Sequence, residues 1–155
     1  MEQKDLIVKL RHLSREFDCI KNDLSDDILD KCHENLLNKG RLIYVENNGE
    51  LLGYTESWRI NYEQFGRRIC GERIDLERED IQTGKIVYIN NVTIRPDARK
   101  SLTIKLMRNQ FYMQNIDCEY VVGERNGKKH RPVKVFKMRE MLAEKALNTE
   151  ELYGW

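Results

Sequence analysis

The amino-acid sequence predicts one α/β domain of the mixed α+β type, with helices flanking a central, mostly antiparallel sheet that contains one parallel strand pair. Three observations predict it. Apolar residues recur at helical spacing over 3–39. A β-hairpin pattern follows over 42–60. Residues 85–123 then form a strand–helix–strand pattern with short joints, which implies a right-handed parallel crossover.

Length and composition limit the classes of protein. The 155 residues suit a single domain over 1–155. The chain is 40% apolar and 34% charged with only 9 Gly and 2 Pro, which excludes collagen-like and low-complexity sequences. No apolar run approaches the ~18 residues of a membrane helix, and the start lacks the apolar core of a signal peptide. We therefore expect a soluble, cytoplasmic chain with no membrane partner.

Charge is unevenly distributed along the chain. The net charge is +1, yet residues 1–80 carry −5 and residues 81–155 carry +6. Such a chain can offer a basic face to phosphates. The simpler interpretation is that two solvated faces of the protein happen to differ in net charge. Its four cysteines form no CxxC pair and are expected to be free thiols in a reducing compartment: Cys19, Cys32, Cys70 and Cys118.

Two amphipathic helices are expected before residue 40. The first presents a stripe made up of Leu6, Leu10, Leu13 and Phe17. The second should begin at an N-cap, Ser25, and end at Gly40. Its stripe is made up of Ile28, Cys32 and Leu36, widened by Leu29 and Leu37. His12, His33 and His130 fall in separate elements and are most simply surface groups.

A hairpin is the next expected element. Strands over 42–46 and 50–60 flank Asn48-Gly49, the sequence that a type I′ turn favours. The following segment, 61–84, is rich in charged residues. We expect it to be exposed and partly helical, and either to have a function of its own or only to connect the neighbouring strands.

The strand over 85–94 is apolar nearly throughout, as expected of a strand covered on both faces. Asn90-Asn91 in its middle predicts a β-bulge. A turn at 95–97 and an N-cap at Ser101 precede a helix that should end at Asn115. Its expected apolar residues are Leu102, Leu106, Met107 and Phe111. A second strand over 118–123 completes the crossover.

The segment 125–139 is basic, with no acidic residue between Asn126 and Arg139. It can contact nucleic-acid phosphates. Phe136 is its one aromatic residue, so base stacking is not supported. We favour a short strand near 133–136 at the edge of the sheet. Its lysines would disfavour pairing with a strand of another chain. A closing helix should carry Met138, Met141, Leu142 and Ala146.

The residues from Val92 to Lys100, leading into Leu106-Met107, resemble the GNAT (Gcn5-related N-acetyltransferase) superfamily. An apolar strand end, the IRPDAR piece and an apolar helix carry the resemblance, which extends over about residues 5–140 and is best over 42–140. Asn126 resembles an Asn that the family often has after the next strand. Phe136 falls near a position where the family often has Tyr.

The resemblance implies a GNAT-like fold and acetyl-CoA as cofactor. It places Thr93 and Ile94 beside the pantetheine arm. The pyrophosphate would lie at the loop and helix start, where unpaired N–H groups and the helix dipole favour anions. The implied cofactor-binding residues are Thr93, Ile94, Arg99, Lys100, Ser101, Leu102, Thr103, Ile104 and Asn126.

The sequence departs from the family's pattern at this loop. Leu102 and Ile104 stand where glycines are expected, and each is predicted to add bulk where the phosphates would lie. The long strand also offers no carboxylate for acid–base work. Glu56 and Tyr88 are the nearest polar groups, although an exposed strand residue and a core aromatic are their simpler interpretations. No catalytic residue is assigned.

Two functions follow, from different classes. The missing glycines favour a GNAT-fold protein with an eroded cofactor motif that acts by contact with a protein partner, as an inhibitor, adaptor or assembly component. The chain is short and rich in Asn and Lys, and in this it resembles phage-encoded GNAT-like proteins with eroded motifs, which suggests a phage origin. The alternative is an acyl-CoA-dependent N-acetyltransferase with an unusual phosphate loop.

Overall fold

The computed structural model describes residues 2–18, 21–70, 72, 75–76, 84–123 and 134–147. Its helices are α1 (Gln3–Phe17), α2 (Asp26–Lys39), α3 (Tyr62–Ile69), α4 (Leu102–Gln114) and α5 (Met138–Leu147), and Pro96–Ala98 forms a short 3-10 helix. Its strands are β1 (Arg41–Asn47), β2 (Glu50–Ile60), β3 (Ile86–Ile94), β4 (Tyr120–Gly123) and β5 (Lys134–Lys137).

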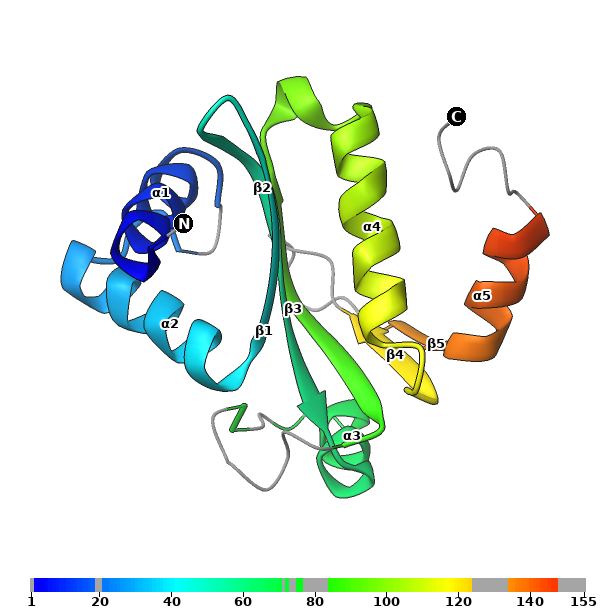
Figure 1. Cartoon of the computed structure of the whole chain (residues 1–155). Coiled ribbons are helices and arrows are strands. Elements are labelled where there is room, and N and C mark those ends of the chain that lie inside the picture. The colour runs from blue at the N-terminus through cyan, green and yellow to red at the C-terminus, as the bar shows by residue number, and fades with distance from the viewer. Residues whose placement is uncertain are drawn as a thin grey trace.

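The described strands form one five-stranded sheet in the order β1-β2-β3-β4-β5. Only β3 and β4 are parallel, and the other neighbouring pairs are antiparallel. Helices α1 and α2 cover one face and α4 covers the other (Figure 1). This confirms the predicted fold class, the parallel crossover and the edge position of the strand near residue 135.

The hydrophobic core lies on both faces of the sheet. Beneath α4, buried residues of the sheet and of the helix form one cluster: Ile43, Val87, Ala98, Ile104, Met107, Phe111, Cys118, Val121 and Met138. Beneath α1, a second cluster consists of Leu6, Leu10, Leu13, Leu51 and Tyr54. Within the described ranges, no helix is both long enough and apolar enough to cross a bilayer.

Helix α2 begins and ends as predicted but shows a different face to the sheet. The Ser25 hydroxyl accepts the Ile28 amide, and Gly40 is the C-cap. The buried residues are Leu29, His33 and Leu36, whereas Ile28 is 52% exposed. The predicted stripe through Ile28 was therefore wrong, as was the surface position of His33. The helix is turned by about one residue, because the His33 ring packs against Tyr54 of β2.

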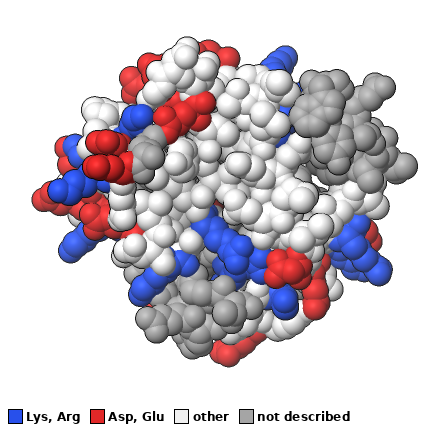
Figure 2. Space-filling view, in the orientation of Figure 1, with Lys and Arg blue, Asp and Glu red and all other residues white. Residues whose placement is uncertain are grey.

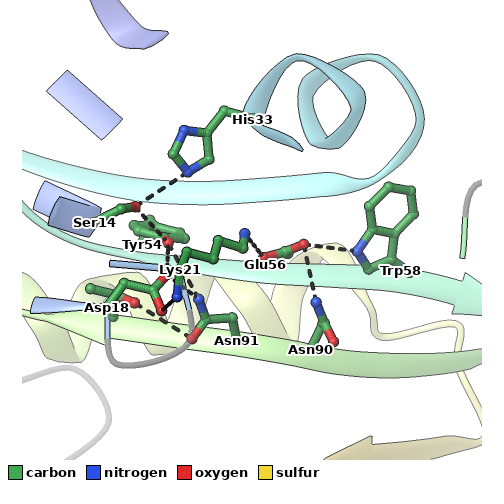
Figure 3. A network of polar contacts seen from close by, with 10 residues as sticks. Ser14, Asp18, Lys21, His33, Tyr54, Glu56, Trp58, Asn90 and Asn91 are labelled. Carbon is green, nitrogen blue, oxygen red and sulfur yellow. Dashed lines mark hydrogen bonds and ion pairs between the residues drawn. The ribbon is translucent and has the colours of Figure 1, made fainter. Parts of the chain in front are cut away.

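The local signals in β1–β2 and β3 are confirmed. Asn48 and Gly49 both have positive φ, 51° and 81°, which joins β1 to β2 by the expected turn. Between β2 and β3, Glu56 pairs with Asn91 but Ser57 pairs with Ile89. Asn90 is thus the extra residue of a β-bulge. The bulge directs the Asn90 and Asn91 side chains to the same face, toward α1 and α2 (Figure 3).

Segment 61–84 is helical in its first part. The Asn61 side chain accepts the Gln64 amide and caps α3. Phe65 of α3 stacks on Tyr120 of β4, with ring centroids 5.6 Å apart. The predicted partly helical excursion is confirmed for Tyr62–Ile69, and 77–83 lie outside the described residues.

Helix α4 is capped by Ser101, whose hydroxyl accepts the Ile104 amide, and it ends at Asn115 as predicted. Its buried residues are Ile104, Met107 and Phe111. Of the apolar residues expected on this helix, Leu102 and Leu106 are 49% and 40% exposed.

Candidate functional site

A cavity of about 240 Å³ lies on the α4 face of the sheet, beside Ile89 of β3 and Gly123 of β4. The described pairing of these strands runs from Ile86↔Tyr120 to Ile89↔Gly123, while β3 continues to Ile94. Six residues of β3, β4 and α4 are among those that line the cavity: Ile89, Val92, Ile94, Gly123, Met107 and Phe111.

The cavity wall is mainly apolar. Its polar contributions come from Thr55 of β2 and from Arg108 and Tyr112 of α4. A narrow apolar cavity with few polar groups suits a chain-like ligand with an apolar or amide-bearing body.

The N-terminus of α4 offers an anion-attracting group of donors. The first intrahelical bond is from the Lys105 amide to the Ser101 carbonyl, and the Ser101 hydroxyl takes the Ile104 amide. Helix geometry therefore leaves the Leu102 and Thr103 amides without an intrahelical acceptor. Arg99 and Lys100, just before the helix, are exposed and form no ion pair with any described residue.

The predicted cofactor residues divide between several places. Ile94 lines the cavity. The Thr93 side chain points to the opposite face, where its hydroxyl lies 3.5 Å from the Asn91 amide oxygen. Arg99, Lys100, Ser101, Leu102 and Thr103 gather at the start of α4. Asn126 lies outside the described residues.

The Ile104 side chain lies beneath α4. Its side chain is fully buried in the core beneath α4, so it does not stand in front of the helix amides. The third residue of this helix points inward, because α4 packs that face against the sheet. Leu102 does remain at the exposed helix start.

On the α1–α2 face, a buried polar network centres on Asp18, which is 1% exposed (Figure 3). One carboxylate oxygen accepts from the Tyr54 hydroxyl at 2.7 Å and from the Asn91 amide at 2.6 Å. The other accepts the Lys21 backbone amide. Burial raises the pKa of Tyr54 far above its ordinary value, and the Asp18 charge raises it further. Tyr54 is therefore a neutral phenol that donates to a carboxylate.

The network continues to α2 through Ser14. The Ser14 hydroxyl lies 3.1 Å from the Tyr54 hydroxyl and 3.3 Å from His33 Nε2. Ser14 and His33 are both fully buried. Burial, followed by the charge of Lys21, lowers the pKa of His33 to about 4. The ring is neutral near pH 7, and its Nδ1 has no hydrogen-bond partner among the described residues.

A buried ion pair lies beside this network. Lys21 Nζ donates to Glu56 Oε2 at 2.6 Å. The second Glu56 oxygen accepts from the Trp58 indole at 3.4 Å and from the Asn90 amide at 3.2 Å. The interpretation of Glu56 as an exposed strand residue was wrong, because β2 is a central strand and Lys21 covers it.

Asn90 connects the two faces of the sheet. It follows Ile89, which lines the cavity, while its own side chain reaches Glu56 on the other face. The bulge thus lies between the cavity and the buried ion pair.

The structure also places Tyr88 and Phe136, two aromatic residues considered in the sequence. Tyr88 is 5% exposed, and its hydroxyl accepts from Arg68 Nε at 3.3 Å, which confirms a satisfied core aromatic. Phe136 of β5 lines the cavity.

Arg59 of β2 fixes the connection between α4 and β4. Its guanidinium, 3% exposed, donates to the Asn115 side chain and to both carboxylate oxygens of Asp117. This contact holds the pKa of Asp117 well below its usual range. The connection leads into β4, so Arg59 helps to position one wall of the cavity.

The roles of Asp18, Lys21 and Tyr54 in a polar site were not predicted from the sequence. Their signal was weak, since only the alternation of Tyr54, Glu56 and Trp58 along β2 indicated that these three share a face. Among the described residues, no group of His, Cys, Asp and Glu could hold a metal ion.

No family model matches the sequence, and no curated protein matches it. Solved structures resemble the fold, among them the following two. The GNAT-like decarboxylase GphF, in complex with isobutyryl-CoA, superposes with a TM-score of 0.51 at 14% identity, covering 79% of this chain and 62% of that one. The loading GNATL domain of CurA from Lyngbya majuscula gives 0.46 at 20% identity, covering 83% and 65%.

The chain therefore has a GNAT-like fold, as the resemblance implied. It spans less than two thirds of the length of either solved chain.

Proposed function

We propose that this protein binds a CoA thioester and transfers its acyl group to an amine, as an acyl-CoA-dependent N-acyltransferase. The observation that carries the proposal is the apolar cavity beside Ile89 and Gly123, on the same face of the sheet as α4. The fold supports a ligand of this class, since the GNAT-like decarboxylase GphF is in complex with isobutyryl-CoA.

In this proposal the pantetheine arm occupies the cavity beside Val92 and Ile94. Thr93 contributes through its backbone, because its side chain faces the other side of the sheet. The pyrophosphate lies at the start of α4, where the Leu102 and Thr103 amides and the helix dipole favour an anion.

Charged side chains complete the proposed phosphate site. Arg99 and Lys100 are exposed beside the Ser101 cap and can form charge-assisted hydrogen bonds to phosphate. Arg95 is less suited, because Asp97 and Glu50 already pair with it. Ile104 supports the helix from beneath, and the role of Asn126 stays a prediction.

No acidic side chain is among the described residues that line the cavity. The Glu56 carboxylate lies on the opposite face of the sheet and is paired with Lys21, so we assign no catalytic base.

Binding is tested by thermal unfolding with saturating acetyl-CoA. A ligand at about 100 times its Kd adds about 2.7 kcal/mol, which should raise Tm by roughly 5 °C or more. Val92→Phe narrows the cavity and should abolish most of the shift. Val8→Phe is the matched control, since Val8 and Val92 are both 40% exposed and Val8 lies on α1. An unchanged Tm in the wild-type protein would contradict the proposal.

The phosphate site is tested separately. Arg99→Ala with Lys100→Ala should reduce the acetyl-CoA shift by more than half, because two charges at the proposed pyrophosphate are lost. Lys4→Ala with Lys31→Ala removes the same charge from exposed positions on the α1–α2 face. An equal reduction in both double variants would mean that only net charge matters.

A second function, contact with a protein partner as an inhibitor, adaptor or assembly component, is favoured by one observation. Leu102, Leu106 and Met113 form an exposed apolar stripe along α4. Figure 2 shows that the surface over α4 and the adjoining sheet carries few charged side chains, whereas those over α1 and α2 are many. If this function holds, Leu106→Glu with Met113→Glu should abolish capture of a partner that wild-type protein retains.

A further inference from the structure

Helix α4 presents an exposed apolar row on the side that faces away from the sheet. The residues that it buries are Ile104, Met107 and Phe111. On the opposite side Leu102, Leu106 and Met113 are exposed, Met113 by 69%. Single exposed apolar side chains are common on protein surfaces, whereas a row of them along one helix indicates a contact surface.

The spacing of this row is typical of a helix that packs along another helix. Leu106 follows Leu102 by four residues, and Met113 follows Leu106 by seven. Asn109 falls between them, three residues after Leu106 and four before Met113, which gives the alternating spacing of a coiled-coil seam. A helix that lies on a bilayer needs a broader apolar face, and Asn109 interrupts this narrow one. The row therefore fits an amphipathic helix better than a membrane surface.

The charges around the row have one sign. No Asp or Glu occurs over 98–116, a range that contains four cations: Arg99, Lys100, Lys105 and Arg108. Every other α-helix in the described part of the chain contains acidic residues. Lys105 and Arg108 form no ion pair with a described residue. They directly precede Leu106 and Asn109, so helix geometry places both cations along the same flank of the row.

We propose that this face of α4 docks an acidic amphipathic helix of a partner protein. This inference rests on the second proposed function, contact with a protein partner. Apolar side chains of the partner helix cover Leu106 and Met113, and its carboxylates pair with Lys105 and Arg108. A second copy of this chain fits less well, because two α4 helices side by side would bring their cations together. A nucleic acid would pair with the cations through its phosphates but would leave the apolar row uncovered.

The test uses the full chain and two synthetic fluorescent peptides of three heptads each. Both peptides carry Leu at the a and d positions. One carries Glu and the other Lys at the e and g positions, so that like charges keep each peptide from pairing with itself. Fluorescence anisotropy should show that the Glu peptide binds at least about tenfold more tightly than the Lys peptide, with a preference that salt weakens. Equal binding of the two peptides would overturn the proposal.

Charge reversal on the flank tests the role of the cations. Lys105→Glu with Arg108→Glu should reverse the preference between the two peptides, because the flank changes sign. Lys4→Glu with Lys31→Glu makes the same change in net charge on α1 and α2 and should leave the preference as it is. An equal effect of both double variants would show that net charge alone selects the peptide and would overturn the proposal.

The apolar row is tested by one exposed position on each side of the molecule. Leu106→Glu should weaken binding of the Glu peptide at least about tenfold. Ile28→Glu is the matched control on α2, where Ile28 is 52% exposed, and it should change binding much less. If both variants bind like the wild-type protein, the row does not contact the peptide and the proposal is wrong.

Other occupants give different results. Binding to phosphatidylserine vesicles that depends on Leu106, without a preference for the Glu peptide, would overturn the proposal in favour of a membrane. A dimer that Leu106→Glu dissociates would overturn it in favour of a second copy. A captured partner that depends on Leu106 and Met113 but not on the charges at Lys105 and Arg108 would exclude the acidic helix while leaving the contact function in place. If neither the Glu peptide nor a captured partner depends on Leu106, both proposals are wrong.

Discussion

The ammonium group of Lys21 and the carboxylate of Glu56 lie 2.6 Å apart, although the two residues are 35 positions apart in the chain. Lys21 lies in the connection between α1 and α2, and Glu56 lies in the middle of β2. The contact fastens this connection to the sheet directly beside the bulge at Asn90. Four predictions follow from this region and from the packing around it.

Removal of one partner of the buried pair should be costly. Glu56→Gln leaves the Lys21 charge without a counter-charge, and we expect a loss of about 3–5 kcal/mol in the free energy of unfolding. Lys21→Met with Glu56→Leu should recover a large part of that loss. Urea denaturation measures both.

The control is the more exposed pair of Lys9 and Glu46, whose side chains are 31% and 24% exposed. Glu46→Gln should cost no more than about 1 kcal/mol, because solvent screens that pair. Equal losses for the two Glu→Gln variants would contradict the importance of burial.

The Tyr54 hydroxyl should stabilise the network. Tyr54→Phe removes a donor to Asp18 and a partner of Ser14, and we expect a loss of about 1–3 kcal/mol. Tyr44 is the direct cross-strand partner of Tyr54 on β1. Tyr44→Phe is the matched control and should change stability by less than about 0.5 kcal/mol. A difference near zero between the two variants would show that the hydroxyl contributes nothing.

His33 should make the protein less stable in acid. Its pKa is about 4 in the folded chain and 6.5 in the ordinary case, so the unfolded chain binds a proton more readily. The resulting stabilisation is complete above pH 6.5 and is lost as pH falls toward 4, by at most about 3 kcal/mol.

Titration of stability with pH tests the role of His33. His33→Gln keeps a polar side chain but does not titrate, so its free energy of unfolding should fall less steeply between pH 6.5 and 4. His12→Gln, at an exposed position of α1, should follow the wild-type curve. If the His33 variant also follows that curve, the buried imidazole is not the group responsible.

Two glycines should respond oppositely to alanine. A Cβ on Gly84 would lie 2.0 Å from the Ile60 carbonyl oxygen, so the backbone must move and we expect a loss of about 1–3 kcal/mol. A Cβ on Gly66 would meet nothing within 4 Å. Because Gly66 lies within α3, Gly66→Ala should add about 0.5–1 kcal/mol. Thermal unfolding measures both, and a stabilising Gly84→Ala would contradict the packing described.

Some features could be predicted because their causes are local. The turn at Asn48-Gly49 follows from backbone conformations that those residues tolerate. The caps at Ser25 and Ser101 follow from a hydroxyl three residues before an amide. The bulge at Asn90 was marked by polar residues within an apolar strand.

The candidate site was predicted only in part. The start of α4 could be found, because strand, turn and cap lie next to one another in the sequence. The cavity could not be found, because residues of several strands and helices line it. Phage origin, cytoplasmic location and the role of Asn126 stay predictions.

The sequence by itself determined the order of helices and strands and their caps and turns, because each depends on neighbours a few residues away. Only the tertiary structure decided that Asp18, Lys21, Glu56 and His33 are buried and that Ile104 points inward. Burial depends on which face of a helix meets the sheet, and that choice is made by the packing of the whole chain rather than by any single segment.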